Sequence, residues 1–280
     1  MRTTFTVGAD ETGLRLDQVV PKHVEGLSRR KARAVIDTGG VFVNKSRVKV
    51  AGRPVRAGQV IEVNVGGALD RAEPAAHVIV HVDDHVIVVD KPAGLVTAPT
   101  PESDRGDLLD RLAHEYGEVY LVHRIDMPTS GLLVFARTRE ANKLLGDAFV
   151  RHDIDRIYHA VAVGDVAAQT IDRPIEGKRA VTHVEALERL ANATLIAARL
   201  ETGRTHQIRI HLAGLGNPIA GDAQHGGEVS RTFVPRPPRM ALHATTLGFT
   251  HPARAERLRF DSPLPPDLAA WVARLRPVGE

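Results

Sequence analysis

The 280-residue sequence contains no cysteine. This absence excludes a disulfide framework and any site in which thiolates hold a metal ion. The sequence also lacks an apolar run long enough to span a membrane, and its first residues lack the apolar stretch of a signal peptide. We therefore expect a cytoplasmic protein without a membrane partner.

The excess of charge is small overall but unevenly distributed. The formal net charge is +3, yet residues 1–70 carry 12 Lys and Arg against 7 Asp and Glu, while the remaining 210 residues carry 25 against 27. A basic N-terminal part ahead of a nearly neutral body is typical of a module that binds a polyanion. Hydrophobic residues make up 43% of the chain, which is enough for a core, so we do not expect disorder.

The N-terminal residues predict a small domain with two helices and a hairpin. Pro21 should end or kink the first helix, which starts near residue 14. Ser28 is a typical N-cap for the second helix. Arg29, Arg30 and Arg33 crowd the first turns of that helix, where cations oppose the helix dipole. We therefore expect these three arginines to bind phosphate groups.

Residues 14–65 resemble the S4 domain, a small RNA-binding module. The matching segments are RLD at residues 15–17, SRR at 28–30, VFVN at 41–44 and AGQVIEV at 57–63. The resemblance implies an α/β S4-like RNA-binding domain over residues 1–66, with its core at 14–65. Residues 67–75 look like a linker because glycine and proline punctuate them.

Residues 76–280 predict a second domain that is rich in strands. Segments typical of strands lie at residues 77–82, 85–89, 156–164, 181–190, 194–202 and 242–249. A few amphipathic helices fall between them without regular alternation of strand and helix. We therefore predict an α+β domain with a largely antiparallel sheet.

A polar loop lies between two apolar segments at residues 121–136. It carries Arg124, Asp126 and Thr129, and such a loop is where a rigid scaffold presents reactive groups. Asp126 is the candidate acid. Alternatively, Asp126 merely caps the turn that contains Pro128 and Thr129.

The second domain resembles the RluA family of RNA pseudouridine synthases. The matching motifs, in the family's order, are VVDKPAG at 88–94, HRID at 123–126, TSGL at 129–132, YHAVAVG at 158–164, TGRTHQIRIHL at 202–212 and LHA at 242–244. Together they favour a catalytic role for Asp126 over a purely turn-capping one. Ile125, Met127, Pro128 and His225 depart from the usual family pattern, but none of them occupies a proposed catalytic position.

The resemblance implies an enzyme that breaks the N1–C1′ bond of uridine and rejoins the base through C5. Nothing is oxidised or imported, so we expect no cofactor and no metal. Asp126 would act beside the sugar, either by attacking carbon or by removing a sugar proton, and both routes stay open. Arg209 matches the position that pairs with this carboxylate. Tyr158 matches the position that stacks on the flipped uracil and assists deprotonation at C5.

The resemblance also implies a set of substrate-binding residues. Arg124 would enter the gap that the flipped base leaves, Leu242 would line the pocket, and Thr129 and His206 lie within the matching motifs. A metal site at His206 and His211 is not expected, because a spacing of five residues puts them on different helix faces. Aromatic residues are only 4% of the chain, so RNA affinity should come mainly from phosphate contacts and RNA shape.

We therefore expect a stand-alone, monomeric isomerase that acts on structured RNA. The S4-like domain favours ribosomal RNA, in particular that of the large subunit, over transfer RNA, by analogy. Two alternatives stay open. One is a non-catalytic RNA-binding or ribosome-assembly factor with the same fold, and the other is a nucleosidase that releases uracil instead of rejoining it.

Overall fold

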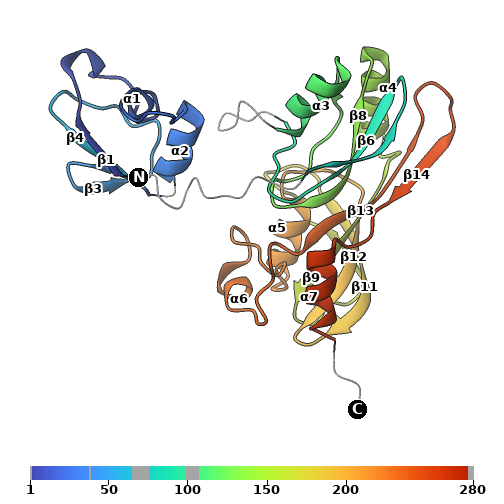
Figure 1. The fold of residues 1–280 in the computed structure, drawn as a ribbon. Helices are drawn as coiled ribbons and strands as arrows, with labels where there is room; N and C mark the ends of the chain where they lie inside the picture. Colours follow the sequence, from blue (N-terminus) through green and yellow to red (C-terminus); the bar gives the residue numbers. More distant parts are fainter. Residues whose placement is uncertain (1, 38, 65–75, 99–106, 277–280) are drawn as a thin grey trace. The chain divides into compact units, whose positions relative to one another are not determined.

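The computed structural model describes residues 2–37, 39–64, 76–98 and 107–276 (Figure 1). These residues form two compact units, one from the N-terminal residues up to 64 and one from residues 76–98 and 107–276. The boundaries expected from the sequence stay predictions, and the expected linker at 67–75 lies outside the described residues. Within these ranges, no helix has the length and apolar character that a membrane crossing requires.

The N-terminal unit packs two helices against a four-stranded sheet. The sheet order is β1-β4-β2-β3. The elements are β1 (Arg2–Thr6), η1 (Ala9–Glu11), α1 (Leu16–His23), α2 (Arg29–Asp37), β2 (Val41–Val43), β3 (Ser46–Val48) and β4 (Val60–Asn64). Fully buried side chains such as Leu16, Ile36 and Ile61 join both helices to the sheet in one apolar core.

The predictions for Ser28 and Pro21 can be compared with helices α2 and α1. The backbone N–H of Lys31 donates to Ser28 Oγ at 3.3 Å, which confirms Ser28 as the cap of α2. The expectation that Pro21 ends the helix is wrong, because α1 continues through it to His23, and the expected kink stays a prediction. Proline removes one backbone hydrogen bond. Complete burial of neighbouring residues such as Val20 offsets that loss.

The second unit is built on a ten-stranded sheet. The order along the sheet is β10-β11-β12-β9-β13-β8-β6-β5, with β14 beside β13 and β7 beside β8. Its strands are β5 (Val78–Val82), β6 (Val86–Lys91), β7 (Tyr120–Leu121), β8 (Ser130–Ala136), β9 (Asp155–Val163), β10 (Gln169–Asp172), β11 (Val181–Leu190), β12 (Ala193–Leu200), β13 (Leu242–Thr250) and β14 (Arg257–Asp261). The pairings are antiparallel except where β13 runs parallel to β8, so the predicted α+β class with a largely antiparallel sheet is confirmed.

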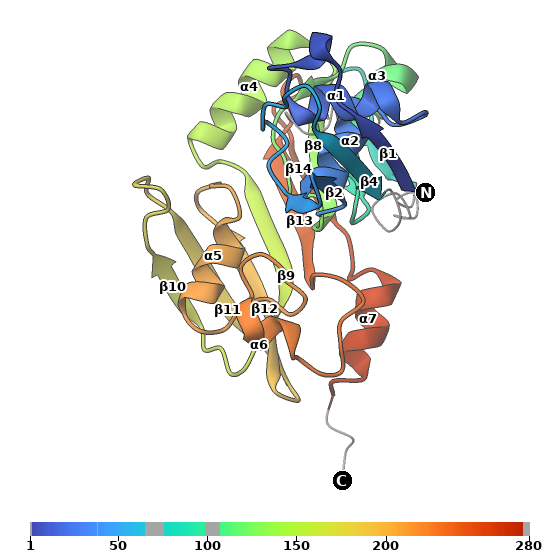
Figure 2. The same cartoon turned by 90° about the vertical axis from the view of Figure 1, so that its left-hand side faces the viewer.

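Five helices accompany this sheet: α3 (Leu108–Tyr116), α4 (Arg139–Val150), α5 (Gln207–Gly214), α6 (Gly227–Arg231) and α7 (Pro266–Ala273). Strands β6 and β8 are buried on both faces, which explains their nearly continuous apolar sequence. Alternate residues of β6 enter different cores: Ile87 packs in the core that contains α3, and Val88 in the core that contains α4. Figure 2 shows α5 beside the strands β10, β11 and β12, and α5 contacts β11.

The parallel contact between β8 and β13 brings distant parts of the chain together. Gly131 has φ +115° there, and a Cβ at this position would lie 2.3 Å from the carbonyl oxygen of Ala244. Ser130 Oγ and His243 Nδ1 lie 2.9 Å apart across the same contact. Because β9 pairs with the other side of β13, the loop before β8 comes close to Tyr158 on β9.

Candidate active site

A pocket of about 500 Å³ opens in the second unit. Its volume lies in the range of sites that bind small ligands. It gathers all seven site residues that the sequence predicted in this unit: Arg124, Asp126, Thr129, Tyr158, His206, Arg209 and Leu242. These residues come from four separate segments of the chain: the loop before β8, strand β9, the start of helix α5 and the start of strand β13.

The loop that carries Asp126 is a tight turn. The backbone N–H of Thr129 donates to the carbonyl oxygen of Asp126 at 3.0 Å. The carboxylate of Asp126 does not cap this turn. One of its oxygens accepts a hydrogen bond from Arg209, and the other lies 3.8 Å from His206. Asp126 therefore takes part in the turn through its backbone and leaves its side chain to the pocket.

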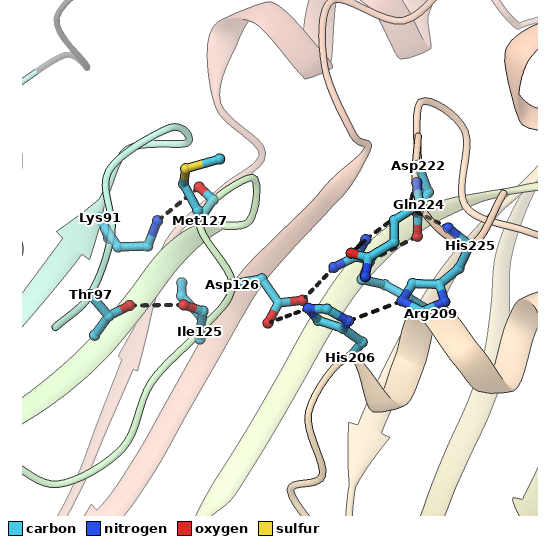
Figure 3. Close-up of polar contacts among 10 residues, drawn as sticks. All are labelled: Lys91, Thr97, Ile125, Asp126, Met127, His206, Arg209, Asp222, Gln224 and His225. Atoms are coloured by element: carbon cyan, nitrogen blue, oxygen red, sulfur yellow. Dashed lines mark hydrogen bonds and ion pairs between the residues drawn. The ribbon is translucent and has the colours of Figure 1, made fainter. Parts of the chain in front are cut away.

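The two carbonyl groups that flank Asp126 are also held (Figure 3). Thr97 Oγ1 donates to the carbonyl oxygen of Ile125 at 2.8 Å. The carbonyl oxygen of Met127 accepts from the backbone N–H of Gly94 at 2.7 Å and from Lys91 Nζ at 3.4 Å. A carboxylate whose backbone is fixed on both sides is preorganised, because little conformational freedom remains to be lost on substrate binding.

Lys91 lies in the matching VVDKPAG motif, and the sequence argument gave it no role. Its side chain is fully buried, and its Nζ also donates to the carbonyl oxygens of Pro92 at 3.0 Å and Leu95 at 2.8 Å. Burial lowers the pKa of Lys91 to about 7, although the nearby Asp126 carboxylate acts in the opposite direction. Lys91 thus joins the loop after β6 to the loop of Asp126.

Arg209 links Asp126 to a second carboxylate. Its Nη1 donates to Asp126 Oδ2 at 3.0 Å, while its Nε and Nη2 each donate to Asp222 at 2.8 Å. Figure 3 shows this guanidinium between the two acids, with Gln224 Oε1 accepting a further bond at 3.1 Å. Side-chain exposure is 4% for Arg209 and 1% for Asp222, against 22% for Asp126. The bidentate pair with Asp222 therefore anchors Arg209, and its remaining donor orients the more accessible carboxylate.

The charge states in this cluster follow from its contacts. Burial alone would raise the pKa of Asp222, but hydrogen bonds from Arg209 and from the backbone N–H groups of His225 and Gln224 hold it below its usual value. Burial opposes the charge of Arg209, yet its bonds to Asp222 and Asp126 raise its pKa. The guanidinium is therefore charged at neutral pH. Asp222 belongs to the Gly221-Asp222 pair, a further motif of the family resemblance, but sequence reasoning gave it no role of its own.

His206 precedes helix α5 in the left-handed conformation, with φ 55°. Its Nε2 lies 3.8 Å from Asp126 Oδ1, and its Nδ1 lies 2.9 Å from Nε2 of His225. Burial lowers the pKa of His206, so its imidazole is neutral at pH 7. No side chain caps helix α5, and Thr202 Oγ1 donates to Gln207 Oε1 at 2.8 Å just before its first turn.

Tyr158 and Leu242 lie on the neighbouring strands β9 and β13. The backbone of Tyr158 pairs with that of Ala244, and Leu242 pairs with Ala160. Both side chains line the pocket and are nearly buried, at 7% and 4% exposure. Burial raises the pKa of the Tyr158 phenol, so this group is protonated at neutral pH. The aromatic ring of Tyr158 and the aliphatic side chain of Leu242 therefore give this part of the pocket lining apolar surface.

The other two predicted residues of the Asp126 loop differ in exposure. Arg124 is exposed where it lines the pocket. Thr129 is buried, and its hydroxyl has no hydrogen-bond partner among the residues that the structure describes. A buried hydroxyl without a partner is costly. Thr129 is therefore available to a group that enters the pocket.

The predicted phosphate-binding arginines of the N-terminal unit have an intramolecular role as well. Asp17 is completely buried and accepts hydrogen bonds from Arg15 at 3.1 Å, from Arg29 at 3.3 Å and from Arg33. The sequence argument took these arginines as unfavourable to local stability because it did not include Asp17. Phosphate binding by Arg29, Arg30 and Arg33 stays a prediction.

No group of three or more His, Cys, Asp or Glu side chains in the described ranges is arranged to hold a metal ion. The imidazole of His206, which lies 3.8 Å from Asp126, forms its hydrogen bond with the imidazole of His225. The arrangement around Asp126 offers an oriented carboxylate, a charged guanidinium, a phenol and a neutral imidazole in one half-closed pocket. These groups suit proton transfer or attack at carbon next to a bound base.

Comparison with known proteins identifies the family. The model of RNA pseudouridylate synthases matches residues 85–214, and that of the S4 domain matches residues 14–61. An uncharacterised RNA pseudouridine synthase, YlyB of Bacillus subtilis (strain 168), is 36% identical, with 98% of each chain covered. The chain belongs to the RNA pseudouridine synthase family. The predicted RluA-type resemblance and the S4 resemblance are both confirmed.

Other members of the family agree with this assignment. Ribosomal large subunit pseudouridine synthase D of Nitrosomonas europaea is 36% identical over 97% of this pseudouridine synthase and 87% of its own chain. Among solved structures, human RNA pseudouridylate synthase domain containing 1 aligns with a TM-score of 0.59 and 26% identity, covering 71% of this chain and 90% of its own. The fold and the enzyme class are therefore shared with proteins that span most of the same length.

Proposed function

We propose that this pseudouridine synthase isomerises specific uridines in ribosomal RNA, in particular that of the large subunit. Relatives of nearly equal length named ribosomal large subunit pseudouridine synthase D support this choice of substrate over transfer RNA. We further propose that the enzyme works as a monomer in the cytoplasm, where it would meet its RNA before or during ribosome assembly.

The observation that carries the proposal is the placement of the Asp126 carboxylate. It lies in a pocket of nucleotide size and receives a hydrogen bond from the buried, charged Arg209 at 3.0 Å. In the proposed mechanism, Asp126 acts on the ribose of the flipped uridine, either by attack at C1′ or by removal of a sugar proton. The N1–C1′ bond breaks with its electron pair on N1, and the uracil turns. C5 then bonds to C1′ as Asp126 leaves C1′ or returns the sugar proton. Loss of the C5 proton to a basic group and protonation of N1 complete the isomerisation.

The walls of the pocket supply the contacts that hold the base during this turn. Tyr158 would stack on the uracil, with Leu242 beside it on the next strand. The partnerless hydroxyl of Thr129 would bond a uracil or ribose oxygen, and the neutral His206 could accept or donate a proton near Asp126. Arg124, exposed at the pocket, would fill the gap in the RNA stack and offset an unstacking cost of a few kcal/mol.

The S4 domain would bind the RNA outside this pocket. Phosphate contacts position RNA-binding proteins and dominate their affinity. Arg29, Arg30 and Arg33 are the proposed contacts, and Arg29 keeps half of its side chain exposed while it bonds to Asp17. A buried acid that fixes arginines on one helix face would also preorganise them for phosphate.

The test compares pseudouridine maps of total RNA from cells with and without this gene, and from cells that carry Asp126→Asn. We expect sites in large-subunit ribosomal RNA to lose pseudouridine in both altered strains. The purified variant should keep its RNA affinity while isomerisation falls by roughly 10²–10⁴-fold or more. Asp165→Asn, at a surface carboxylate of the same unit, is the matched control and should behave as the wild type.

Each alternative outcome has a distinct meaning. An unchanged map of ribosomal RNA with altered transfer RNA would overturn the substrate. Free uracil released by the wild type would identify a nucleosidase. An unchanged map throughout, with RNA binding intact, would identify a binding or assembly factor that kept the fold.

A further inference from the structure

A second arginine of the pocket has no role in the catalytic cluster. Arg156 lies on β9 two residues before Tyr158, so both side chains point from the same face of the strand, about 7 Å apart along it. Both residues line the pocket. The side chain of Arg156 is nearly buried, with 7% of the residue exposed.

Unlike Arg209, Arg156 is not neutralised by the protein. Among the described residues, no carboxylate lies within ion-pair distance of it, and its buried Nε has no hydrogen-bond partner. Its Nη2 makes one long hydrogen bond of 3.4 Å to the carbonyl oxygen of Glu201. The guanidinium also lies over the ring of Phe149, 5.1 Å from the centroid. These contacts fix its orientation but leave its charge uncompensated.

Burying an unpaired charge is costly, so a protein keeps one where a ligand completes the site. The pKa shifts reflect this unpaired charge: burial lowers the pKa of Arg156 itself, and burial together with the charge of Arg156 lowers the pKa of His123 to about 3. His123 is therefore neutral and does not balance the charge of Arg156. A neutral uracil oxygen could accept a hydrogen bond from Arg156 but could not balance its charge.

We propose that Arg156 binds a backbone phosphate adjacent to the target uridine, so that the base reaches Tyr158 while the phosphate reaches the guanidinium. The inference rests on the proposed function of the pocket. A guanidinium presents donors in a planar fork that matches two phosphate oxygens, and Arg156 lines the pocket that would hold them. The spacing of the two residues along β9 is of the size of a nucleotide.

Gly203 lies directly against this guanidinium, where a larger residue would contact it. A Cβ at Gly203 would lie 2.7 Å from Nη1 of Arg156. Gly203 also lines the pocket. Glycine at this position therefore lets Arg156 extend along the pocket wall instead of being displaced from it.

The first test measures RNA affinity against salt concentration for the wild type, Arg156→Met and Arg156→Lys. The probe is a stem-loop of large-subunit ribosomal RNA that the full-length protein binds. We expect Arg156→Met to bind about 10–100-fold more weakly. Its salt slope should fall by about 0.7–0.9, the contribution of one phosphate. Arg156→Lys should restore the slope but only part of the affinity, since it keeps the charge without the fork.

The matched control is Arg257→Gln, which removes one positive charge from the same unit. Arg257 is paired with Asp153 and Asp155 outside the pocket, so we expect the wild-type salt slope. Thermal melting of the RNA-free proteins separates ligand binding from a structural role. Because Arg156→Met removes an uncompensated buried charge, it should melt no lower than the wild type.

The second test locates the phosphate. Neutral methylphosphonates replace, one at a time, the phosphates that flank the target uridine. We expect one position to weaken wild-type binding strongly and to leave Arg156→Met unaffected. Equal losses for both proteins at every position, or an unaltered salt slope in Arg156→Met, would overturn the inference. Isomerisation is followed in parallel: a wild type that binds the RNA but forms no pseudouridine would overturn the proposed function, while the binding data still decide the role of Arg156.

Discussion

The anchoring of Arg209 by Asp222 leads to a quantitative prediction for Asp222→Asn. In the wild type, both oxygens of Asp222 accept hydrogen bonds from Arg209 at 2.8 Å. An asparagine keeps one acceptor oxygen but places an NH2 group against the guanidinium. One charged hydrogen bond is lost and the negative charge that anchors Arg209 disappears, while the bond from Arg209 to Asp126 stays possible.

The loss of one hydrogen bond between charged groups corresponds to about 1.5–3 kcal/mol of unfolding free energy. The effect on isomerisation should be larger than this loss suggests. Without its anchor, Arg209 can follow Asp126, so the carboxylate is no longer held in one position. A displacement of about 1 Å can reduce a rate by roughly 10²-fold. RNA affinity should change little, because phosphate contacts lie elsewhere.

Tritium release from C5 of uridine-labelled RNA measures the rate, and urea unfolding measures stability. Asp267→Asn is the matched control, because Asp267 accepts two hydrogen bonds from Arg239 in the same bidentate manner but is 43% exposed. An exposed pair contributes about 0–1 kcal/mol, so this control should keep its activity and nearly all its stability. If Asp222→Asn isomerised RNA at the wild-type rate, the argument that Asp222 orients the catalytic carboxylate through Arg209 would be refuted.

Two further predictions concern the scaffold. Burial alone would raise the pKa of Asp17, but its bonds to Arg33, Arg15 and Arg29 hold this pKa below the usual 3.8. The ionised carboxylate therefore stabilises the fold above about pH 4, and this stabilisation is lost as the pH falls through the pKa of Asp17 in the folded protein. Asp17→Asn should therefore lower the stability of the N-terminal unit by about 3–5 kcal/mol at pH 7 and flatten its acid dependence, as measured by amide hydrogen exchange in α2; an unchanged acid profile would contradict this. Gly131→Ala should destabilise the second unit by roughly 1–3 kcal/mol or more in urea unfolding, because its Cβ would meet the Ala244 carbonyl oxygen at 2.3 Å. Gly146→Ala in α4, where nothing lies within 4 Å of the added Cβ, is its control and should unfold no earlier than the wild type.

Local patterns in the sequence predicted local structure well. Ser28 caps the helix that follows it, and both the segment at 85–89 and the second apolar segment of 121–136 form buried strands. These features depend on neighbours within a few residues, which the sequence lists directly. Pro21 does not end α1 as expected, because the packing that holds this helix comes from residues of the core far along the chain.

The charged contacts of the site could not be predicted in the same way. Asp17 lies 12 residues before Arg29 and 16 before Arg33, and Asp126 lies 83 residues before Arg209. Such pairs form only when the fold brings their elements together, and the residue types alone allow many other partners. Motif resemblance supplied the pair of Asp126 and Arg209, but it gave no partner for Asp17 and no role for Asp222.

The two buried arginines of the pocket show how its charge is arranged. Arg209 is balanced by Asp222 and oriented towards Asp126, so this side of the pocket presents a carboxylate to the ligand. Arg156 is balanced by no carboxylate of the described residues, so its side presents a net positive charge. If the roles proposed above hold, a nucleotide can enter in one orientation, with its phosphate at Arg156, its base on Tyr158 and its ribose at Asp126. The reverse orientation would bring phosphate against the carboxylate and leave the guanidinium unpaired, and both arrangements are unfavourable.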